Sequence, residues 1–132
     1  RLAVLFQMCF PGMPSVFYGD ELGVAGVLEA DYRSPMPWQG GDAESLAFYK
    51  RAIALRRTLA PLQRGEFRAL DARRGSGLFA FAREYGGERV NVVLHCSERA
   101  ENFAPAGEML WSEGLAGGKI GPYGFAVSIE MG

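Results

Sequence analysis

The order of apolar and polar residues changes its period near residue 65. Before that point, apolar residues recur at helical spacing or in short continuous runs, and after it they alternate with polar or small residues. Glycine and proline divide the alternating part into several short segments. The pattern therefore predicts an α/β first part, residues 1–64, followed by an all-β part, residues 65–132, built as a small antiparallel β-sandwich.

One helix and one strand are predicted before residue 20. Residues 2–10 are apolar almost all round, which predicts a helix that needs partners on several sides. Residues 16–18 form a short apolar run between Pro14 and Gly19. Such a run is typical of a strand that is buried on both faces in a parallel sheet.

The clearest helix signal begins after Asp42. Aspartate is a favoured N-cap residue, while Pro61 and Gly65 predict where the helix ends. The apolar residues between these points recur every three or four positions and form one stripe: Phe48, Ala52, Leu55, Leu59 and Leu62. Residues 23–41 show neither period and predict a long loop, the kind of segment that usually carries function.

The strands predicted after residue 65 are amphipathic. Residues 85–88, Tyr-Gly-Gly-Glu, predict a turn between two of them. His95 is out of phase with its apolar neighbours, so we expect it to point outward or to cap a neighbouring loop, without a nearby carboxylate to support catalysis. The residues expected on the core face are Phe79, Phe81, Val90, Val92, Leu94, Phe125, Val127 and Ile129.

Composition and charge exclude several classes of partner. A hydrophobic content of 48% with 22% charged residues is typical of a chain with a packed core. A net charge of −1 gives no basic surface for nucleic acid, and residues 2–10 are too short to span a bilayer. No nucleotide-binding glycine motif is present, and the spacing of Cys9, Cys96 and the single histidine gives no metal site. We therefore expect no cofactor and two buried, reduced thiols.

The start of the chain bears on its origin and location. It begins without methionine, inside the helix predicted for residues 2–10, so we expect a piece of a longer protein. The apolar start is also without the small-residue cleavage site of a secretory signal. The expected location is therefore the cytoplasm.

Three segments carry a resemblance to a known family. They are "FPGMPSVFYGDELG" (residues 10–23), "DYRSPMPW" (31–38) and "LAFYKRAIALRRTLAPLQRGEF" (46–67). Together they closely resemble the end of the catalytic barrel in the α-amylase family, glycoside hydrolase family 13, and its neopullulanase, cyclomaltodextrinase and α-glucosidase branches. The resemblance implies that residues 1–64 are the last βα portion of a (β/α)₈ TIM barrel and residues 65–132 the C-terminal β-sandwich called domain C.

The resemblance also implies an activity, the retaining cleavage or transfer of α-1,4- or α-1,6-glucosidic bonds in α-glucan oligosaccharides. A retaining enzyme needs two carboxyl groups about 5 Å apart across the bond. Asp20 and Glu21 are adjacent, so at a strand end their side chains diverge. The family's catalytic carboxylates belong to the fourth, fifth and seventh barrel strands, which implies positions upstream of Arg1 and an inactive chain here. Tyr18, Gly19 and Glu21 are then structural support.

The long loop holds the residues that the resemblance assigns to substrate. Relatives offer an acidic residue and, four positions later, an arginine to a glucose unit two subsites from the cleaved bond. Glu29, where aspartate is usual, and Arg33 occupy these positions. The alternative for Arg33 is a surface pair with Asp31 or Glu29. The resemblance further implies that the rest of the barrel, here or in another chain, is a partner, and it leaves calcium open for the complete enzyme.

A second hypothesis assigns the chain no part in catalysis. Residues 65–132 would then be a carbohydrate-binding or purely structural β-sandwich module. A binding module of this kind needs an exposed aromatic platform, and Trp111 and Tyr123 are the candidates that do not fall on the core positions.

Overall fold

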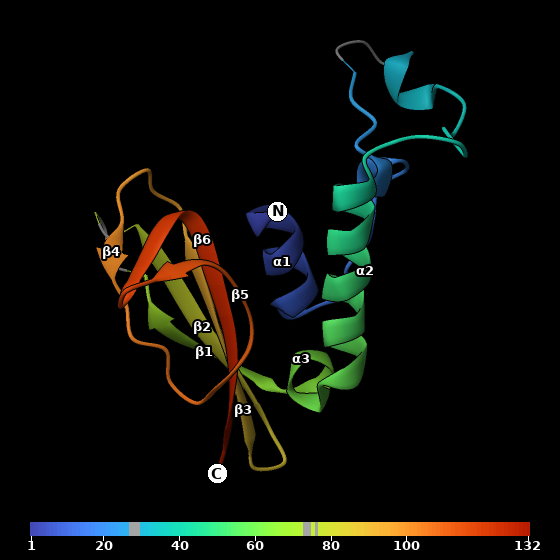
Figure 1. The fold of residues 1–132 in the computed structure, drawn as a ribbon. Helices are drawn as coiled ribbons and strands as arrows, with labels where there is room; N and C mark the ends of the chain where they lie inside the picture. Colours follow the sequence, from blue (N-terminus) through green and yellow to red (C-terminus); the bar gives the residue numbers. More distant parts are fainter. Residues whose placement is uncertain (27–29, 73–74, 76) are drawn as a thin grey trace.

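The computed structural model describes residues 1–26, 30–72, 75 and 77–132 (Figure 1). The described helices are α1 (Leu2–Cys9), α2 (Ala43–Thr58) and α3 (Ala60–Arg64), and 3₁₀ turns cover Asp20–Leu22 and Asp31–Arg33. The described strands are β1 (Glu66–Asp71), β2 (Leu78–Tyr85), β3 (Glu88–His95), β4 (Glu101–Asn102), β5 (Glu108–Ala116) and β6 (Lys119–Met131). The sheet and α2 form two layers with α1 between them (Figure 1).

Helix α2 starts where the sequence predicts. One carboxylate oxygen of Asp42 accepts hydrogen bonds from the backbone N–H groups of Glu44 and Ser45, at 2.9 and 3.2 Å. These bonds satisfy two of the donors that a helix N-terminus leaves without a partner. Helix α2 then places Phe48 and Ala52 in the core, as the predicted stripe requires.

The end of α2 differs from the prediction, because the helix stops at Thr58 and a separate α3 follows. Pro61 has no N–H to bond the carbonyl of Arg57, four residues earlier, so it cannot continue α2. The side-chain amide of Gln63 donates to that carbonyl instead, at 2.8 Å. Leu59 is extended between the two helices, and the chain turns toward the sheet.

The sheet is antiparallel throughout, with the order β1-β2-β3-β6 and with both β4 and β5 paired to β6. Gly86 and Gly87 have φ values of 61° and 83° in the β2–β3 turn, the positive values that a two-residue hairpin turn requires. The predicted turn is therefore confirmed. The predicted alternation is confirmed too, since the residues expected on the core face all pack in one cluster with the helices: Phe79, Phe81, Val90, Val92, Leu94, Phe125, Val127 and Ile129.

A second, smaller cluster lies on the other face of the sheet. Ala80, Val93 and Ala126 pack there with Ile120 and Leu115 from the far ends of β6 and β5. The β5–β6 ladder shifts register between Met109 and Trp111 and again between Glu113 and Leu115. Such bulges bend and twist a strand pair, so the ladder curves over the sheet and gives it a sandwich-like form.

The helices and the sheet share one hydrophobic core. Leu5, Met8 and Cys9 of α1 pack with Leu62 of α3 and with the helix-facing residues of the sheet. Helix α1 is thus covered on one side by the sheet and on the other by α2, which meets its predicted need for several partners. Helix α3 ends at Arg64 and β1 starts at Glu66, so this core extends across the predicted division between residues 64 and 65.

The parallel strand predicted for residues 16–18 is absent from the structure. These residues carry no strand assignment, and the exposed fractions of Val16, Phe17 and Tyr18 are 38%, 63% and 43%. A strand forms only where a neighbouring strand receives its backbone hydrogen bonds, and the described strands all belong to the antiparallel sheet. The segment is attached to α1 by the side chain of Gln7, which donates to the Ser15 carbonyl.

Two arginines bind the carbonyls at the end of α1. Arg56 of α2 donates to the carbonyls of Met8 and Phe10 at 2.7 and 3.1 Å, and also to that of Gly12. Arg83 of β2 is 2% exposed and donates to the carbonyls of Cys9 and Gly65, at 2.9 Å each. Burial, and then the neighbouring Arg56, lower the pKa of Arg83. Cations suit the negative end of a helix, so these bonds join α1 to both of its neighbours.

The cysteines differ in environment. Cys9 is fully buried in the core, and this burial raises the pKa of its thiol to about 12. Cys96 is exposed, so the prediction that both thiols are buried is wrong for it. The reason is its place in the loop after β3, where the alternation of the strand no longer applies.

Candidate functional site

The segment after α1 ends in a tight turn at Gly19. Gly19 is buried with φ 79°, and its carbonyl accepts the N–H groups of Leu22 and Val24, both at 3.0 Å. A side chain at this position would place its Cβ 2.7 Å from a methyl carbon of Val24. Glycine is therefore required by both the backbone conformation and the space, which fits the structural role predicted for Gly19.

Tyr18 connects this turn to the long loop. Its hydroxyl donates to the carbonyl of Ser34 at 3.0 Å, and the hydroxyl of Ser34 donates in turn to the carbonyl of Asp31. Further along, the N–H of Asp42 bonds the carbonyl of Leu22 at 2.9 Å. The loop that contains the predicted substrate residues is thus fastened to the Tyr18–Leu22 turn near its middle and at its end.

The structure describes one of the two predicted substrate residues. Arg33 lies on the 3₁₀ turn Asp31–Arg33 and is exposed, whereas Glu29 lies outside the described residues. Trp38, in the same loop, is 87% exposed.

The adjacent carboxylates lie on a 3₁₀ turn and not at the end of a strand. Asp20 is exposed and Glu21 is half-buried. Neighbouring side chains on a 3₁₀ turn point about 120° apart, so they cannot face each other across a bond. Burial, with the charges of both carboxylates, raises the pKa of Tyr49 on α2. The turn lies against α2.

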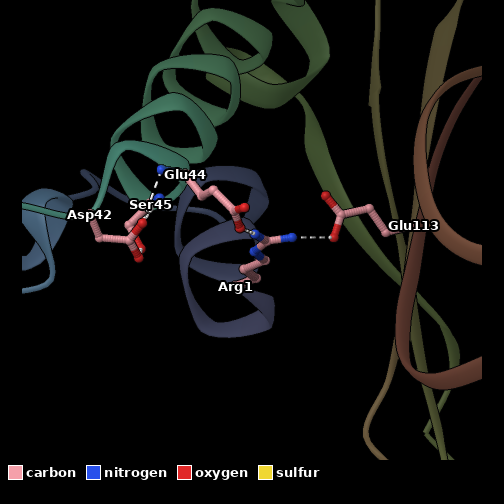
Figure 2. Close-up of polar contacts among 5 residues, drawn as sticks. All are labelled: Arg1, Asp42, Glu44, Ser45 and Glu113. Atoms are coloured by element: carbon pink, nitrogen blue, oxygen red, sulfur yellow. Dashed lines mark hydrogen bonds and ion pairs between the residues drawn. The ribbon is translucent and has the colours of Figure 1, made fainter.

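A polar network joins the N-terminus of α2 to the sheet (Figure 2). The guanidinium of Arg1 lies between Glu44 of α2 and Glu113 of β5, at 2.8 and 3.1 Å, and 5.7 Å from the Phe48 ring. The hydrogen bond and charge of Glu113 raise the pKa of Arg1. The same helix end holds Asp42, whose pKa is lowered by its hydrogen bonds with Ser45. Sequence reasoning did not find this network, because it joins residues far apart in the chain.

The two candidates for an aromatic platform behave differently. Trp111 is only 5% exposed and packs between Phe48 and Phe125, with its ring 4.5 Å from the guanidinium carbon of Arg51. Tyr123 is 57% exposed at a positive φ of 53°. Of the two candidates Tyr123 alone is exposed, which gives the binding-module hypothesis little support.

One of the two expectations for His95, that its side chain points outward, is wrong. It is fully buried, and its Nδ1 lies 2.6 Å from the Gly121 carbonyl. Its Nε2 lies 3.6 Å from a carboxylate oxygen of Glu101 on β4. The expectation that no carboxylate is near His95 is therefore wrong, because β4 brings Glu101 beside it through pairing with β6.

Two kinds of feature are absent from the described part of the chain. No group of three or more acidic, cysteine or histidine residues there is placed to hold a metal ion. Within the same residues, no helix is long and apolar enough to cross a membrane.

Known proteins resemble this chain in sequence. It is 44% identical over 97 residues to neopullulanase 2 of Thermoactinomyces vulgaris, and 39% identical over 103 residues to a cyclomaltodextrinase of Thermoanaerobacter pseudethanolicus. These matches cover 72% and 76% of this chain. The chain belongs to the α-amylase family. It spans 17% and 18% of the length of these two relatives, and no family model matches it.

The fold agrees with this membership. A debranching enzyme from Nostoc punctiforme superposes with a TM-score of 0.81 over 95% of this chain and 29% of its own, at 21% identity. At that identity the likeness concerns the fold alone. The antiparallel sheet corresponds to the C-terminal domain of α-amylase family enzymes.

Proposed function

We propose that this chain is the C-terminal segment of a retaining α-glucan-acting glycoside hydrolase, with the catalytic carboxylates in the part of the enzyme that precedes it. The observation that carries the proposal is the 44% identity to neopullulanase 2 over 72% of the chain. The divergence of Asp20 and Glu21 on one 3₁₀ turn supports their exclusion from catalysis. The expected location of the complete enzyme is the cytoplasm.

We propose further that residues 1–64 are the last βα portion of the catalytic barrel and residues 65–132 a separate C-terminal domain. The apolar residues 16–18 support this, because they are exposed in the described structure although their sequence suits a buried strand. Neighbouring barrel strands, in the same protein or in another chain, would cover them. Helix α2 would then be the eighth barrel helix.

The long loop supplies the substrate contacts in this proposal. Arg33 and Glu29 bind a glucose unit of the α-glucan, with the guanidinium offering paired donors to sugar hydroxyls. The exposure of Arg33 on its 3₁₀ turn is compatible with this role. Tyr18, Gly19 and Glu21 position the loop, a role that the Tyr18 hydrogen bond to Ser34 supports.

A chimera tests the proposed function. The chain replaces the matching segment of the Thermoanaerobacter cyclomaltodextrinase, to which it is 39% identical. We expect the chimera to degrade cyclodextrins, and the isolated chain to turn over neither cyclodextrins, pullulan nor maltotriose. A chimera that is folded by circular dichroism but inactive would overturn the proposal, as would turnover by the isolated chain.

Replacement of Arg33 by alanine in the chimera tests the substrate contact. Loss of a charged hydrogen-bond donor costs about 1.5–3 kcal/mol, so we expect kcat/KM on maltooligosaccharides to fall by roughly 10-fold to 100-fold. The matched control is Arg57→Ala, which removes an exposed arginine of α2. Equal kinetics of the two variants would show that Arg33 is an ordinary surface residue.

A further inference from the structure

The turn that carries Arg33 is closed by the residue that follows it. Ser34 donates two hydrogen bonds to the carbonyl of Asp31, one from its backbone N–H at 3.2 Å and one from its side-chain hydroxyl at 2.6 Å. The N–H of Arg33 donates to the carbonyl of Ala30, also at 3.2 Å. A 3₁₀ turn of three residues has few bonds of its own, and their geometry is poorer than in an α-helix. The hydroxyl of Ser34 therefore adds a short bond where the turn needs one.

Ser34 also joins the turn to the segment after α1. Its carbonyl accepts a hydrogen bond from the hydroxyl of Tyr18 at 3.0 Å. Pro35 disfavours helical backbone at the residue before it, and Ser34 is extended, with φ −58° and ψ 151°. The N–H, the hydroxyl and the carbonyl of Ser34 are thus all engaged, two with the turn and one with Tyr18.

The turn lies apart from the sheet. Figure 1 shows it beyond the N-terminal end of α2. Asp31 is half-buried, and both Arg33 and Ser34 are exposed. Because the turn contributes no residue to the hydrophobic core of the described chain, local hydrogen bonds set the direction in which it presents Arg33.

The direction of Arg33 matters for the substrate contact proposed above. A guanidinium offers its donors in a rigid fork, so it binds two sugar hydroxyls together only when the fork is aligned with both. Hydrogen bonds weaken steeply as the donor angle is lost. A small rotation of the turn would therefore break one bond of the pair, and a residue that fixes the turn affects binding without touching the sugar.

We propose that Ser34 is a positioning residue for the α-glucan, whose hydroxyl holds the 3₁₀ turn in the orientation that Arg33 needs to bind a glucose unit. The role rests on the proposed function, because Arg33 must contact substrate for its direction to matter. The three supports proposed above act on the loop as a whole, whereas Ser34 acts on the turn itself. The hydrogen of its hydroxyl is directed at the Asp31 carbonyl and not at a ligand.

Variants of the cyclomaltodextrinase chimera test this role. Ser34→Ala should lower kcat/KM on maltooligosaccharides by roughly 3-fold to 10-fold, mainly by raising KM, because binding of the sugar is weakened throughout the reaction. Ser34→Thr keeps the hydroxyl and should restore most of the loss. The matched control is Ser45→Ala, which removes a serine hydroxyl that donates to Asp42 at the same distance, 2.6 Å. The control should keep the kinetics of the parent chimera.

A double-mutant cycle with Arg33→Ala separates positioning from general stabilisation of the loop. Since Ser34 acts through Arg33, Ser34→Ala should have no further effect on kcat/KM once Arg33 is alanine. Equal losses in the presence and absence of Arg33 would overturn the proposal. Parent kinetics for Ser34→Ala would also overturn it, as would a Ser34→Thr variant as weak as Ser34→Ala. An inactive chimera would overturn the proposed function itself, and this role with it.

Discussion

Two segments that were predicted as strands reach opposite outcomes. Residues 90–94 form the middle of β3, where Val90 and Val92 are fully buried, whereas Phe17 in the run at residues 16–18 is 63% exposed. Strand β3 pairs with β2 and β6, and its apolar face meets the helices. Residues 16–18 pair with none of the described strands. Apolar residues alone therefore do not make a buried strand, because neighbouring strands decide whether one forms.

The sharpest test of this contrast compares two phenylalanines. Phe81 is fully buried among the rings of Phe6, Phe10, Phe67 and Phe79. Its replacement by alanine should lower the free energy of unfolding by about 3–5 kcal/mol, because a cavity remains in the core. The matched change Phe17→Ala should alter it by less than about 0.5 kcal/mol. Urea denaturation measures both, and comparable losses would contradict the distinction between the two regions.

A smaller effect is expected at the link between α1 and the sheet. Arg83→Met keeps the length of the side chain but leaves the carbonyls of Cys9 and Gly65 without their donor. Stability should fall by about 2–4 kcal/mol, since buried acceptors would be left without a partner. Arg68→Met, which removes an exposed arginine paired with Glu84, is the control. A loss no larger than that of the control would mean that the hydrogen bonds of Arg83 do not help to hold α1 against the sheet.

The smallest expected effect concerns the N-cap of α2. The pKa of Asp42 is lowered by its hydrogen bonds with Ser45, so the ionised cap contributes stability above the ordinary aspartate pKa of about 3.9. This contribution is lost as the pH falls through the lower pKa of the folded state. Asp42→Asn keeps the cap without titrating, so its unfolding midpoint should fall less between about pH 5 and 2. Parallel curves for the two proteins would show that protonation of Asp42 does not weaken α2.

Local rules predicted much of the fold. The N-cap at Asp42, the stripe on α2, the turn at Gly86 and Gly87 and the alternation in β2, β3 and β6 depend on residues close in sequence. Helix α1 was also predicted, because nine consecutive residues without a polar face leave few alternatives to a buried helix. The family resemblance followed from three short segments, of which residues 46–67 lie mostly in α2 and α3.

The predictions that failed share one cause: each outcome depends on groups that are distant along the chain. Residues 16–18 have the composition of a buried strand, but the partner that would make them one is not among the described strands. The site residues named from the sequence stay a prediction: the Tyr18 hydroxyl reaches the loop at the Ser34 carbonyl, whereas the contribution of Arg33 depends on a substrate. Cys96 was expected to be buried and is exposed, because it lies in the loop after β3, where the alternation of the strand no longer applies.

The sequence by itself determined the elements that nearest neighbours specify: the N-cap of α2, the hairpin turn and the apolar face of β2, β3 and β6. Tertiary structure alone decided that Arg83 reaches the end of α1, that Arg1 lies between Glu44 and Glu113, and that Glu101 meets His95. Propensity and periodicity act over a few residues, whereas hydrogen bonds and ion pairs act over a few ångströms. Only the folded chain brings groups that are far apart in sequence within that distance.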